Sequence, residues 1–345
     1  MTSKAFGLAR LGNAYSDGAL SNRNLVINGA MQVSVRGDST GVTGAAYYGP
    51  DRYRFTVGSA GVGAYTISQD TDAPSGFGYS YKIDCTTADA SPDATDAVFI
   101  ATRFEGQDLQ RLKKGTADAA SVTLSFWVKS NLTGTYQANL FDLDNTRIIG
   151  STYTISVAGT WEYKTITFAG DTSGAFSNDN GLSLQVEWAL DGGTSYTSGA
   201  VPTSWEATSN ADRAAGLTVN LADNTSNYWQ LTGVQLEVSD TSTPFEHRSY
   251  GDELARCQRY YTKADGTITT LMLRPDGFRF VPWYFPVTMR TAPTVAFGSY
   301  NADGGSTSGV TAAIENNKVM LRSSAQETSS SRNPSFSDCT ADAEL

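Results

Sequence analysis

Acid–base chemistry has few candidates in this sequence, because its 345 residues include a single histidine, His247, between Glu246 and Arg248. A histidine titrates near neutral pH and can act as a general base or as a metal ligand. No serine or cysteine lies in a nucleophile-elbow motif that such a base could serve. The sequence therefore predicts a structural position for His247, packed at a domain junction, with Glu246 as a candidate hydrogen-bond partner.

Hydrolysis of a glycosidic bond would instead need two carboxylates at a suitable separation. Four glutamates are candidates, and no spacing singles out a pair: Glu105, Glu162, Glu187 and Glu206. The cysteines Cys85, Cys257 and Cys339 are too far apart for a disulfide framework or a CxxC metal site. We therefore expect a non-enzymatic protein with no catalytic residue and no cofactor.

Calcium is the metal that the acidic turns could hold, because it binds clustered oxygen ligands in flexible loops. One candidate cluster is Asp89, Asp93 and Asp96, and the other is Asp142 with Asp144. Neither matches an EF-hand loop, and acidic turn residues in solvent are the favoured explanation of both. No metal site is predicted, and calcium stays an open alternative at these two places.

Three aromatic residues indicate a different chemistry, because aromatic faces can stack on the apolar side of pyranose rings while polar neighbours bond the hydroxyls. Trp127 lies on the polar face of a predicted strand, and Tyr196 and Trp205 lie in a long Gly/Ser/Thr-rich loop of a kind that is often functional. These three residues are the candidate glycan contacts. For Trp127, burial under another segment or a neighbouring subunit is the competing interpretation.

The charge balance, 25 basic against 35 acidic residues and a net charge of −10, opposes binding to nucleic acid or to an anionic membrane. No segment reaches 18 uninterrupted apolar residues, and the N-terminus lacks the apolar core of a signal peptide. We expect a protein made in a cytoplasm, soluble, not inserted in a membrane, with neutral or cationic partners.

The elements that must position these residues are strands. From Asn24 onward, short runs rich in Val, Ile, Thr, Tyr and Phe alternate with turn residues, which indicates an all-β sandwich or barrel. In the run 121–129, Val122 and Phe126 share one face and Trp127 lies on the other. The predicted strands of the sandwich are 53–57, 64–68, 79–84, 97–101, 121–129, 135–143, 162–168, 182–189, 217–221 and 228–238, with a short helical segment within 104–115.

One convincing helix interrupts this pattern at DELARCQRYY, where Leu254, Cys257 and Tyr261 fall at i, i+3 and i+7 and Asp252 is the candidate N-cap. After it, strand-like runs restart. The predicted organisation is an N-terminal arm (1–23), a jelly-roll-like β-sandwich (24–245), a connecting helix (246–261) and a small C-terminal β domain (262–345).

Two parts of the chain predict contacts with other chains. The arm has only scattered apolar residues, among them Phe6, Leu8 and Leu11, so it should order against a partner. The C-terminal domain has more aromatic residues than one small core should cover, which predicts a homotrimer. The candidate interface residues are Leu254, Cys257, Tyr261, Trp283, Tyr284 and Phe285.

Three stretches together resemble bacteriophage tail fibres and related virion proteins, many of them from marine phages: SNRNLVINGAMQVSVRG (21–37) with DRYRF (51–55), WQLTGVQLEVSDTSTPFEHRSYGDELARCQRYY (229–261), and FPVTMRTAPTV (285–295) with the terminal ADAEL. The resemblance covers most of the chain from about residue 21. It implies a jelly-roll-like sandwich similar to a carbohydrate-binding module, a short helix and a small β domain, in homotrimeric fibres that meet the host surface.

The expected function is that of a bacteriophage virion protein, made in the host cytoplasm and located in a tail or capsid appendage. In a tail fibre, the arm would bind a tail hub or adaptor protein and the sandwich would bind a host-surface glycan. Long tail fibres carry a large attachment domain where this chain has about 23 residues. A capsid decoration or tail adaptor protein that contacts only other virion proteins is therefore the alternative.

Overall fold

The computed structural model describes residues 22–58, 62–89, 91–264, 266–268, 272–273, 279–301, 313–322 and 335–345. The chain forms two compact units, Met1–Arg248 and Ser249–Leu345, and each has its own hydrophobic core. The arm residues Phe6, Leu8 and Leu11 lie outside the described residues. None of the helices in the described ranges is long and apolar enough to span a membrane.

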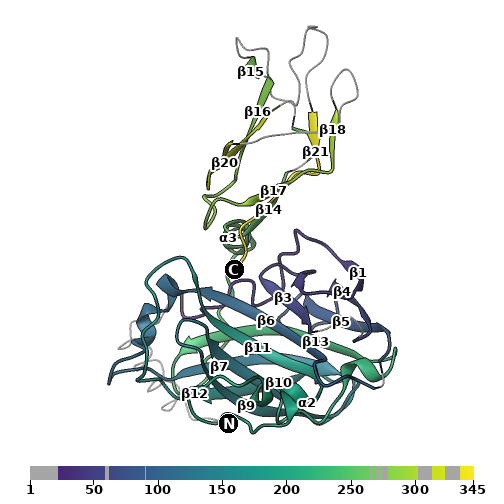
Figure 1. Ribbon diagram of the computed structural model, residues 1–345, viewed down its shortest axis with the longest axis vertical. Coiled ribbons are helices and arrows are strands. Elements are labelled where there is room, and N and C mark those ends of the chain that lie inside the picture. The colour runs from purple at the N-terminus through teal and green to yellow at the C-terminus, as the bar shows by residue number, and fades with distance from the viewer. Residues whose placement is uncertain are drawn as a thin grey trace. The chain divides into compact units, whose positions relative to one another are not determined.

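The first unit is a jelly-roll-like sandwich of two antiparallel sheets, whose two layers are visible in Figure 1. The six-stranded sheet has the order β1 (Ser39–Val42), β4 (Ala64–Asp70), β5 (Ser80–Thr87), β13 (Tyr228–Val238), β7 (Val122–Ser130) and β10 (Glu162–Phe168). The seven-stranded sheet has the order β12 (Glu206–Ala207), β9 (Arg147–Ile155), β8 (Gly134–Asp142), β11 (Leu182–Gly192), β6 (Ala97–Glu105), β3 (Tyr53–Val57) and β2 (Ala46–Tyr47). The all-β prediction is confirmed.

The core lies between the two sheets and follows the two-residue period of the strands. In β7, Leu124, Phe126 and Val128 are fully buried, and Trp188 of β11 packs edge to face on Phe126 at a centroid distance of 5.7 Å. Full burial of one such side chain contributes about 1.5–3 kcal/mol. A one-residue slip would turn these side chains outward, so the pattern fixes the register.

Short helical segments lie between the strands: η1 (Gly106–Leu112), α2 (Thr194–Thr197), η2 (Asn210–Asp212) and η3 (Leu221–Asp223). The helical segment predicted within 104–115 is confirmed by η1. The strand predicted over 217–221 is wrong. Thr218 makes one backbone hydrogen bond, to Thr135, and Asn220 then caps η3 by accepting from Ala222.

The second unit contains α3 (Tyr250–Gln258) and three small antiparallel sheets. Their strands are β14 (Tyr261–Lys263), β22 (Thr340–Asp342) and β17 (Thr294–Ala296); β15 (Met272–Leu273), β16 (Arg279–Tyr284), β20 (Lys318–Arg322) and β19 (Ala313–Ile314); and β18 (Ser299–Asn301) with β21 (Ser335–Ser337). The predicted helix is confirmed, but Ser249 rather than Asp252 caps it, because the Ser249 side chain accepts from the Asp252 N–H.

Most of the residues predicted to lie between chains are buried within the single chain: Cys257, Tyr261, Trp283 and Phe285. Alternation along the strand explains this, since Trp283 and Phe285 point into the core and pack edge to face at 5.0 Å. The core of the single chain therefore covers Trp283 and Phe285. Tyr284, on the other face, is 68% exposed, and Leu254 is half-buried.

Candidate functional site

An aromatic pair lies on the outer face of the six-stranded sheet. Trp127 of β7 and Tyr163 of β10 are directly opposite in the antiparallel register, and their ring centroids are 5.3 Å apart. Trp127 is half-buried and Tyr163 is 43% exposed. Cross-strand partners on one face hold each other in place, so this pair presents two ring faces on a rigid sheet.

Gly233 brings a third ring next to this pair. It lies at a β-bulge in β13 with a φ of 62°, and a Cβ there would be 2.8 Å from Cζ of Phe77 and 3.0 Å from Cδ1 of Trp127. Only glycine tolerates both this backbone conformation and this close ring approach. The bulge therefore seats Phe77 and Trp127 side by side on the backbone of β13.

Phe77 continues the aromatic surface toward the end of the unit. Its ring centroid is 5.0 Å from Phe245 and 5.3 Å from His247, and Phe245 lies 4.8 Å from His247. Within the described residues His247 makes these ring contacts and no hydrogen bond, so the candidate bond to Glu246 is absent. We call the residues Tyr163, Trp127, Phe77, Phe245 and His247 the aromatic row.

Polar groups accompany the aromatic row at the Trp127 end. Asp72 accepts a hydrogen bond from Nε1 of Trp161 at 3.0 Å and forms an ion pair with Lys129, which follows Trp127 by two residues in β7. Burial would raise the pKa of Asp72, but the hydrogen bonds from Lys129 and Trp161 outweigh it, so that pKa is lowered. A charged pair and an indole therefore lie beside the stacking rings.

Trp205 is engaged differently, since it closes one edge of the sandwich. Its Nε1 donates to the carbonyl of Ala169 at 2.7 Å, and its ring packs against the main core. Lys114 lies over the ring, with Nζ 5.5 Å from the centroid, and is also 5.2 Å from the centroid of Phe176. Trp205 thus forms one wall around a buried ammonium group.

The ammonium group of Lys114 is the partner of Asp142, one of the calcium candidates. Lys114 Nζ is 2.6 Å from Oδ2 of Asp142 and 3.1 Å from Oδ2 of Asp171, and it donates to the carbonyls of Ser173 and Gly174 at 2.8 and 2.7 Å. The side chains of Lys114 and both aspartates are at most 3% exposed. We call this arrangement, with the Trp205 and Phe176 rings, the ammonium cage.

Three of the other calcium candidates also have protein partners. Oδ2 of Asp144 accepts from the Ser177 N–H at 2.9 Å, and Oδ2 of Asp96 accepts from the Asp93 N–H at 2.6 Å. Oδ1 of Asp89 accepts from the Ser91 N–H at 3.1 Å. Across the ranges that the structure describes, no group of three acidic, histidine or cysteine side chains could hold a metal ion.

Tyr196 lies over the other sheet. It packs edge to face on Phe99 of β6 at 5.6 Å, and the guanidinium of Arg213 lies 5.7 Å from its ring. Arg213 also pairs with Glu187 of β11 at 2.7 Å. This ion pair and the Phe99 contact fix the loop that carries Tyr196 against the outer face of the seven-stranded sheet.

The three predicted glycan contacts are therefore not brought together. Trp127 belongs to the outer face of the six-stranded sheet, Tyr196 to the loop over the seven-stranded sheet, and Trp205 to an edge between the layers. Sequence reasoning missed Tyr163 and Phe77. Alternation in the strand EYKTITF would have placed Tyr163 outward. Phe77 lies next to Trp127 only because of the bulge at Gly233.

Of the four glutamates considered as hydrolytic carboxylates, three have structural partners and the fourth is exposed. Glu187 is bound by Arg213, and Glu105 accepts from the side chain of Gln107 at 2.6 Å. Glu162 accepts from the backbone N–H groups of residues 156 and 157, and Glu206 is exposed in β12.

In the register of β6 and β11, Glu187 faces Ala101. Glu105 lies four residues further along, about 13 Å away, which exceeds the separation of paired catalytic carboxylates.

Asp191, in β11, makes the stability of the sandwich depend on pH. Burial raises its pKa to about 7, although it accepts a hydrogen bond from the Ala222 N–H at 2.9 Å. The folded chain then holds a proton that the unfolded chain releases above its usual pKa near 4, so stability is lost as pH rises through 7. We expect this group to lower the free energy of unfolding by about 2–3 kcal/mol between pH 5 and pH 8.

Asp191→Asn keeps the acceptor and removes the titration, so its denaturation midpoint should exceed that of the wild type at pH 8 and match it at pH 5. Urea titrations of both proteins at the two pH values measure this. Equal pH dependence in the two proteins would exclude Asp191 as the titrating group.

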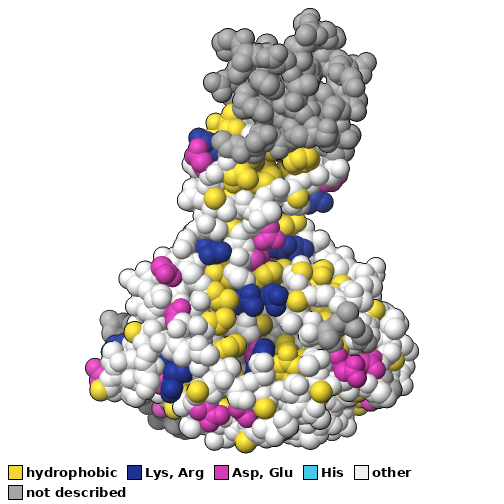
Figure 2. Space-filling view, viewed as in Figure 1, with side chains coloured by type: hydrophobic (Ala, Val, Ile, Leu, Met, Phe, Trp, Pro, Cys, Tyr) yellow, Lys and Arg dark blue, Asp and Glu magenta, His cyan; other side chains and the backbone are white. Residues whose placement is uncertain are grey.

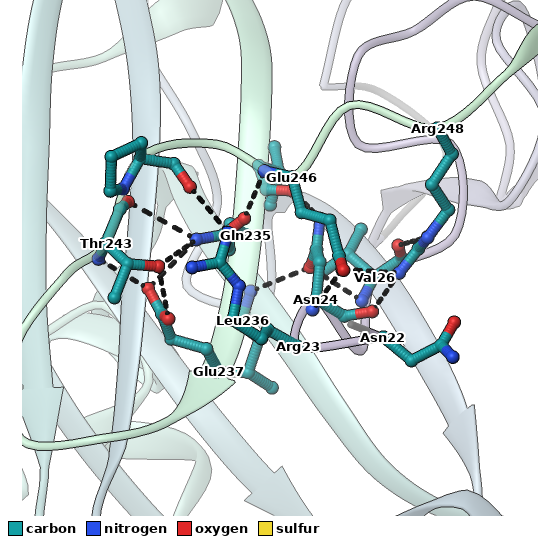
Figure 3. A network of polar contacts seen from close by, with 12 residues as sticks. Asn22, Arg23, Asn24, Val26, Gln235, Leu236, Glu237, Thr243, Glu246 and Arg248 are labelled. Atoms are coloured by element: carbon teal, nitrogen blue, oxygen red, sulfur yellow. Dashed lines mark hydrogen bonds and ion pairs between the residues drawn. The ribbon is translucent and has the colours of Figure 1, made fainter. Parts of the chain in front are cut away.

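A polar network joins the start and the end of the sandwich, as Figure 3 shows. Arg248 donates to the carbonyls of Asn24 and of Val26, the latter at 2.9 Å, and the N–H of Asn24 donates to Oε2 of Glu246 at 2.8 Å. The N–H of Glu246 donates in turn to Oε1 of Gln235 in β13 at 2.8 Å. We call these contacts the clamp.

The clamp explains two of the motifs on which the resemblance to virion proteins rests. Asn24 comes from the stretch SNRNLVINGAMQ, and Gln235, Glu246 and Arg248 come from VQLE and PFEHR. Burial would raise the pKa of Glu246, but backbone N–H groups of residues 23 and 24 and the charge of Arg248 lower it. These residues therefore hold a structural junction at which the chain enters and leaves the sandwich.

The surface charge agrees with the sequence. On the face seen in Figure 2, basic and acidic side chains occur in small groups among uncharged atoms, and no wide basic area is visible among the described residues there. A polyanion would meet no general attraction on such a surface.

No family model and no curated protein matches the chain. Among solved structures, it is similar to the enzymatically active domain of tailspike protein 4 of bacteriophage CBA120 at 13% identity and a TM-score of 0.32, over 63% of this chain and 22% of that one. A putative sugar binding protein from Bacteroides thetaiotaomicron is similar at 12% identity and a TM-score of 0.34, over 63% of this chain and all of that one. A family 11 carbohydrate-binding module from Clostridium thermocellum, solved with a β-1,3-1,4-mixed-linked tetrasaccharide, is similar at 10% identity and a TM-score of 0.29, over 61% of this chain and all of that one.

Proposed function

We propose that the chain is a bacteriophage tail fibre protein whose sandwich attaches the particle to a host-surface glycan through the aromatic row. The observation that carries the glycan part is the Trp127–Tyr163 pair, presented on a rigid sheet beside Trp161 and the Asp72–Lys129 ion pair. Ring faces bind the apolar sides of sugars, and the polar groups bind their hydroxyls. Sheet-borne residues hold such a geometry more precisely than loop residues do.

The virion part of the proposal rests on the sequence stretches that form the clamp and the helix. In the proposed fibre the chain is a homotrimer. Tyr284 and Leu254 take part in its interface, because both keep exposed apolar area in the single chain. Three sites per fibre and several fibres per particle make attachment stable although each sugar contact is weak. The N-terminal arm binds a tail hub or adaptor protein.

A glycan array probed with the full chain tests the binding function. We expect wild-type protein to bind at least one saccharide, and Trp127→Ala and Tyr163→Ala to weaken that binding at least about 10-fold, which corresponds to about 1.4 kcal/mol. Tyr250→Ala removes an aromatic ring of similar exposure from α3 and should bind like the wild type. Unchanged binding by Trp127→Ala would contradict the proposed site.

Immunogold labelling of phage particles that carry the chain tests its location. Label on the tail agrees with the proposal. Label confined to the capsid lattice would instead favour a decoration protein, and glycan binding would then have to be judged from the array alone.

A further inference from the structure

The ammonium cage holds an amine against a carboxyl group in a site that is closed to water. Among the residues that the structure describes, Lys114 is the only buried lysine, and its Nζ is 2.6 Å from Oδ2 of Asp142. Because Cγ of Asp142 is one bond away from Oδ2, Nζ lies within about 4 Å of this carbon, close to the separation of two groups that are placed to react. An amine and a carboxyl group held in this way are the two halves of an amide bond.

The backbone after Lys114 keeps the side chain in this position. The N–H of Gly115 donates to the carbonyl of Asp171 at 2.8 Å, and Gly115 has a φ of 81°. A Cβ on Gly115 would lie 2.7 Å from the backbone nitrogen of Ala175, so only glycine allows this close approach. The segment that carries Lys114 is therefore fixed against the loop that follows β10 and carries Asp171.

Asp171 is placed to move protons between the two reacting groups. Its Oδ2 is 3.1 Å from Nζ of Lys114, and the same oxygen accepts a hydrogen bond from Nε of Arg147 at 2.7 Å. Burial would raise the pKa of Asp171, but the hydrogen bonds that it accepts, chiefly from Arg147, outweigh burial, so that pKa is lowered. Asp171 is therefore ionised and able to accept a proton from Nζ.

Two donors and two rings complete the site. The N–H of Asn145 donates to Oδ1 of Asp142 at 3.1 Å, and Nδ2 of Asn145 donates to Oδ2 at 3.0 Å, so negative charge on either oxygen is stabilised. The rings of Trp205 and Phe176 cover Nζ. The cavity beside the cage has a volume of about 10 Å³, the space that one water molecule needs. Water is therefore scarce where the two groups meet, which favours condensation over hydrolysis.

We propose that Lys114 and Asp142 join in an isopeptide bond, with Asp171 as the proton relay. Asp171 first transfers a proton from Nζ to Oδ2 of Asp142, which leaves a neutral amine and a neutral carboxyl group. The lone pair of Nζ then forms a bond to Cγ, and the displaced electron pair moves to Oδ1, beside the Asn145 N–H. Asp171 transfers a second proton from Nζ to Oδ2, the Cγ–Oδ2 bond breaks, and Oδ2 leaves as water while the C=O bond forms again.

The reaction needs no oxidant, cofactor or second protein. The ammonium group gives up two protons and the carboxylate gives up one oxygen, so the products are a neutral amide and one water molecule. The ion pair of the ammonium cage is the state before the reaction. Two buried charges are costly to keep out of water and the amide has none, so burial favours the product. The bond forms once in each chain and fastens the segment after η1 to the end of β8.

Mass spectrometry of the full chain under denaturing conditions tests the proposal. Relative to Lys114→Arg, corrected for the substitution, wild-type protein should be lighter by one water molecule, because a guanidinium stays charged and does not form this bond. After digestion with trypsin, the peptides 114–129 and 130–147 should stay joined through Lys114 and Asp142. Lys113→Arg is the matched control and should lose water like the wild type.

Wild-type protein of full mass would overturn the proposal. A loss of water that maps to another place, such as a succinimide at Asp191 and Gly192, would overturn it as well. These two outcomes are read from the wild type, so they do not depend on whether any variant folds.

Asp171→Asn tests the proton relay separately from the bond. The amide keeps the size of the side chain and does not pass protons in this way, so the rate of bond formation should fall at least about 100-fold, and freshly purified protein should be mainly unlinked. Circular dichroism shows whether this variant is folded, since an unfolded chain would also stay unlinked. A folded Asp171→Asn variant that is fully linked would exclude Asp171 as the relay.

Discussion

Replacement of Lys114 by methionine is expected to lower the free energy of unfolding by about 3–5 kcal/mol. The change removes one buried cation and leaves Asp142 and Asp171, both nearly inaccessible to solvent, without their shared partner. Asp142 would keep its hydrogen bonds from Asn145, at 3.1 and 3.0 Å, but its buried charge would lose the cation that balances it. Asp171 keeps its bond to Arg147 at 2.7 Å, so the larger part of the loss should come from Asp142.

Lys113→Met is the control for this experiment, because Lys113 is the exposed neighbour of Lys114 and undergoes the same chemical change. A surface substitution of this kind should change stability by at most about 0.5 kcal/mol. Urea denaturation at pH 7 of both variants and the wild type measures the difference. Equal midpoints for the two variants would show that the ammonium cage does not stabilise the sandwich.

The second large effect is expected at the clamp. Arg248→Met should destabilise the sandwich by about 2–4 kcal/mol, because the guanidinium donates to the backbone carbonyls of Asn24 and Val26. The substitution also removes the positive charge beside Glu246. Residues 22–26 should then detach from β13 before the rest of the unit unfolds.

Limited proteolysis followed by mass spectrometry detects that detachment, since cleavage near residues 22–26 should become at least several-fold faster in Arg248→Met. Arg256→Met, on the exposed side of α3, removes a similar side chain without touching the clamp and should behave like the wild type. Accelerated cleavage throughout the sandwich, with none favoured at its start, would contradict the local role assigned to Arg248.

Long alternating runs predicted the sandwich well. The strands expected at 53–57, 162–168 and 228–238 coincide with β3, β10 and β13, because apolar residues at every second position leave only one face for the core. The run 217–221 has the same local composition. However, Thr218 makes a single backbone hydrogen bond, to Thr135, and Asn220 caps the helical segment η3 that follows. β9 was missed because RIIGSTYTI lacks strict alternation.

The candidate site was predictable only in part. Alternation placed Trp127 outward, and the same argument would have placed Tyr163 beside it. The other members of the aromatic row come from loops, and the bulge at Gly233 contacts Phe77 across 156 residues of sequence (233 − 77 = 156). The ammonium cage was equally hidden, since nothing local to Lys114 indicates that Asp142 and Asp171 converge on it.

The most direct test of the glycan-binding role is a crystal structure of the full chain soaked with the saccharide that binds best on the array. We expect a sugar ring stacked on Trp127 and Tyr163, with hydroxyls bonded to Lys129 or Asp72. A saccharide bound instead beside Trp205 or Tyr196, with the outer face of the six-stranded sheet bare, would contradict it.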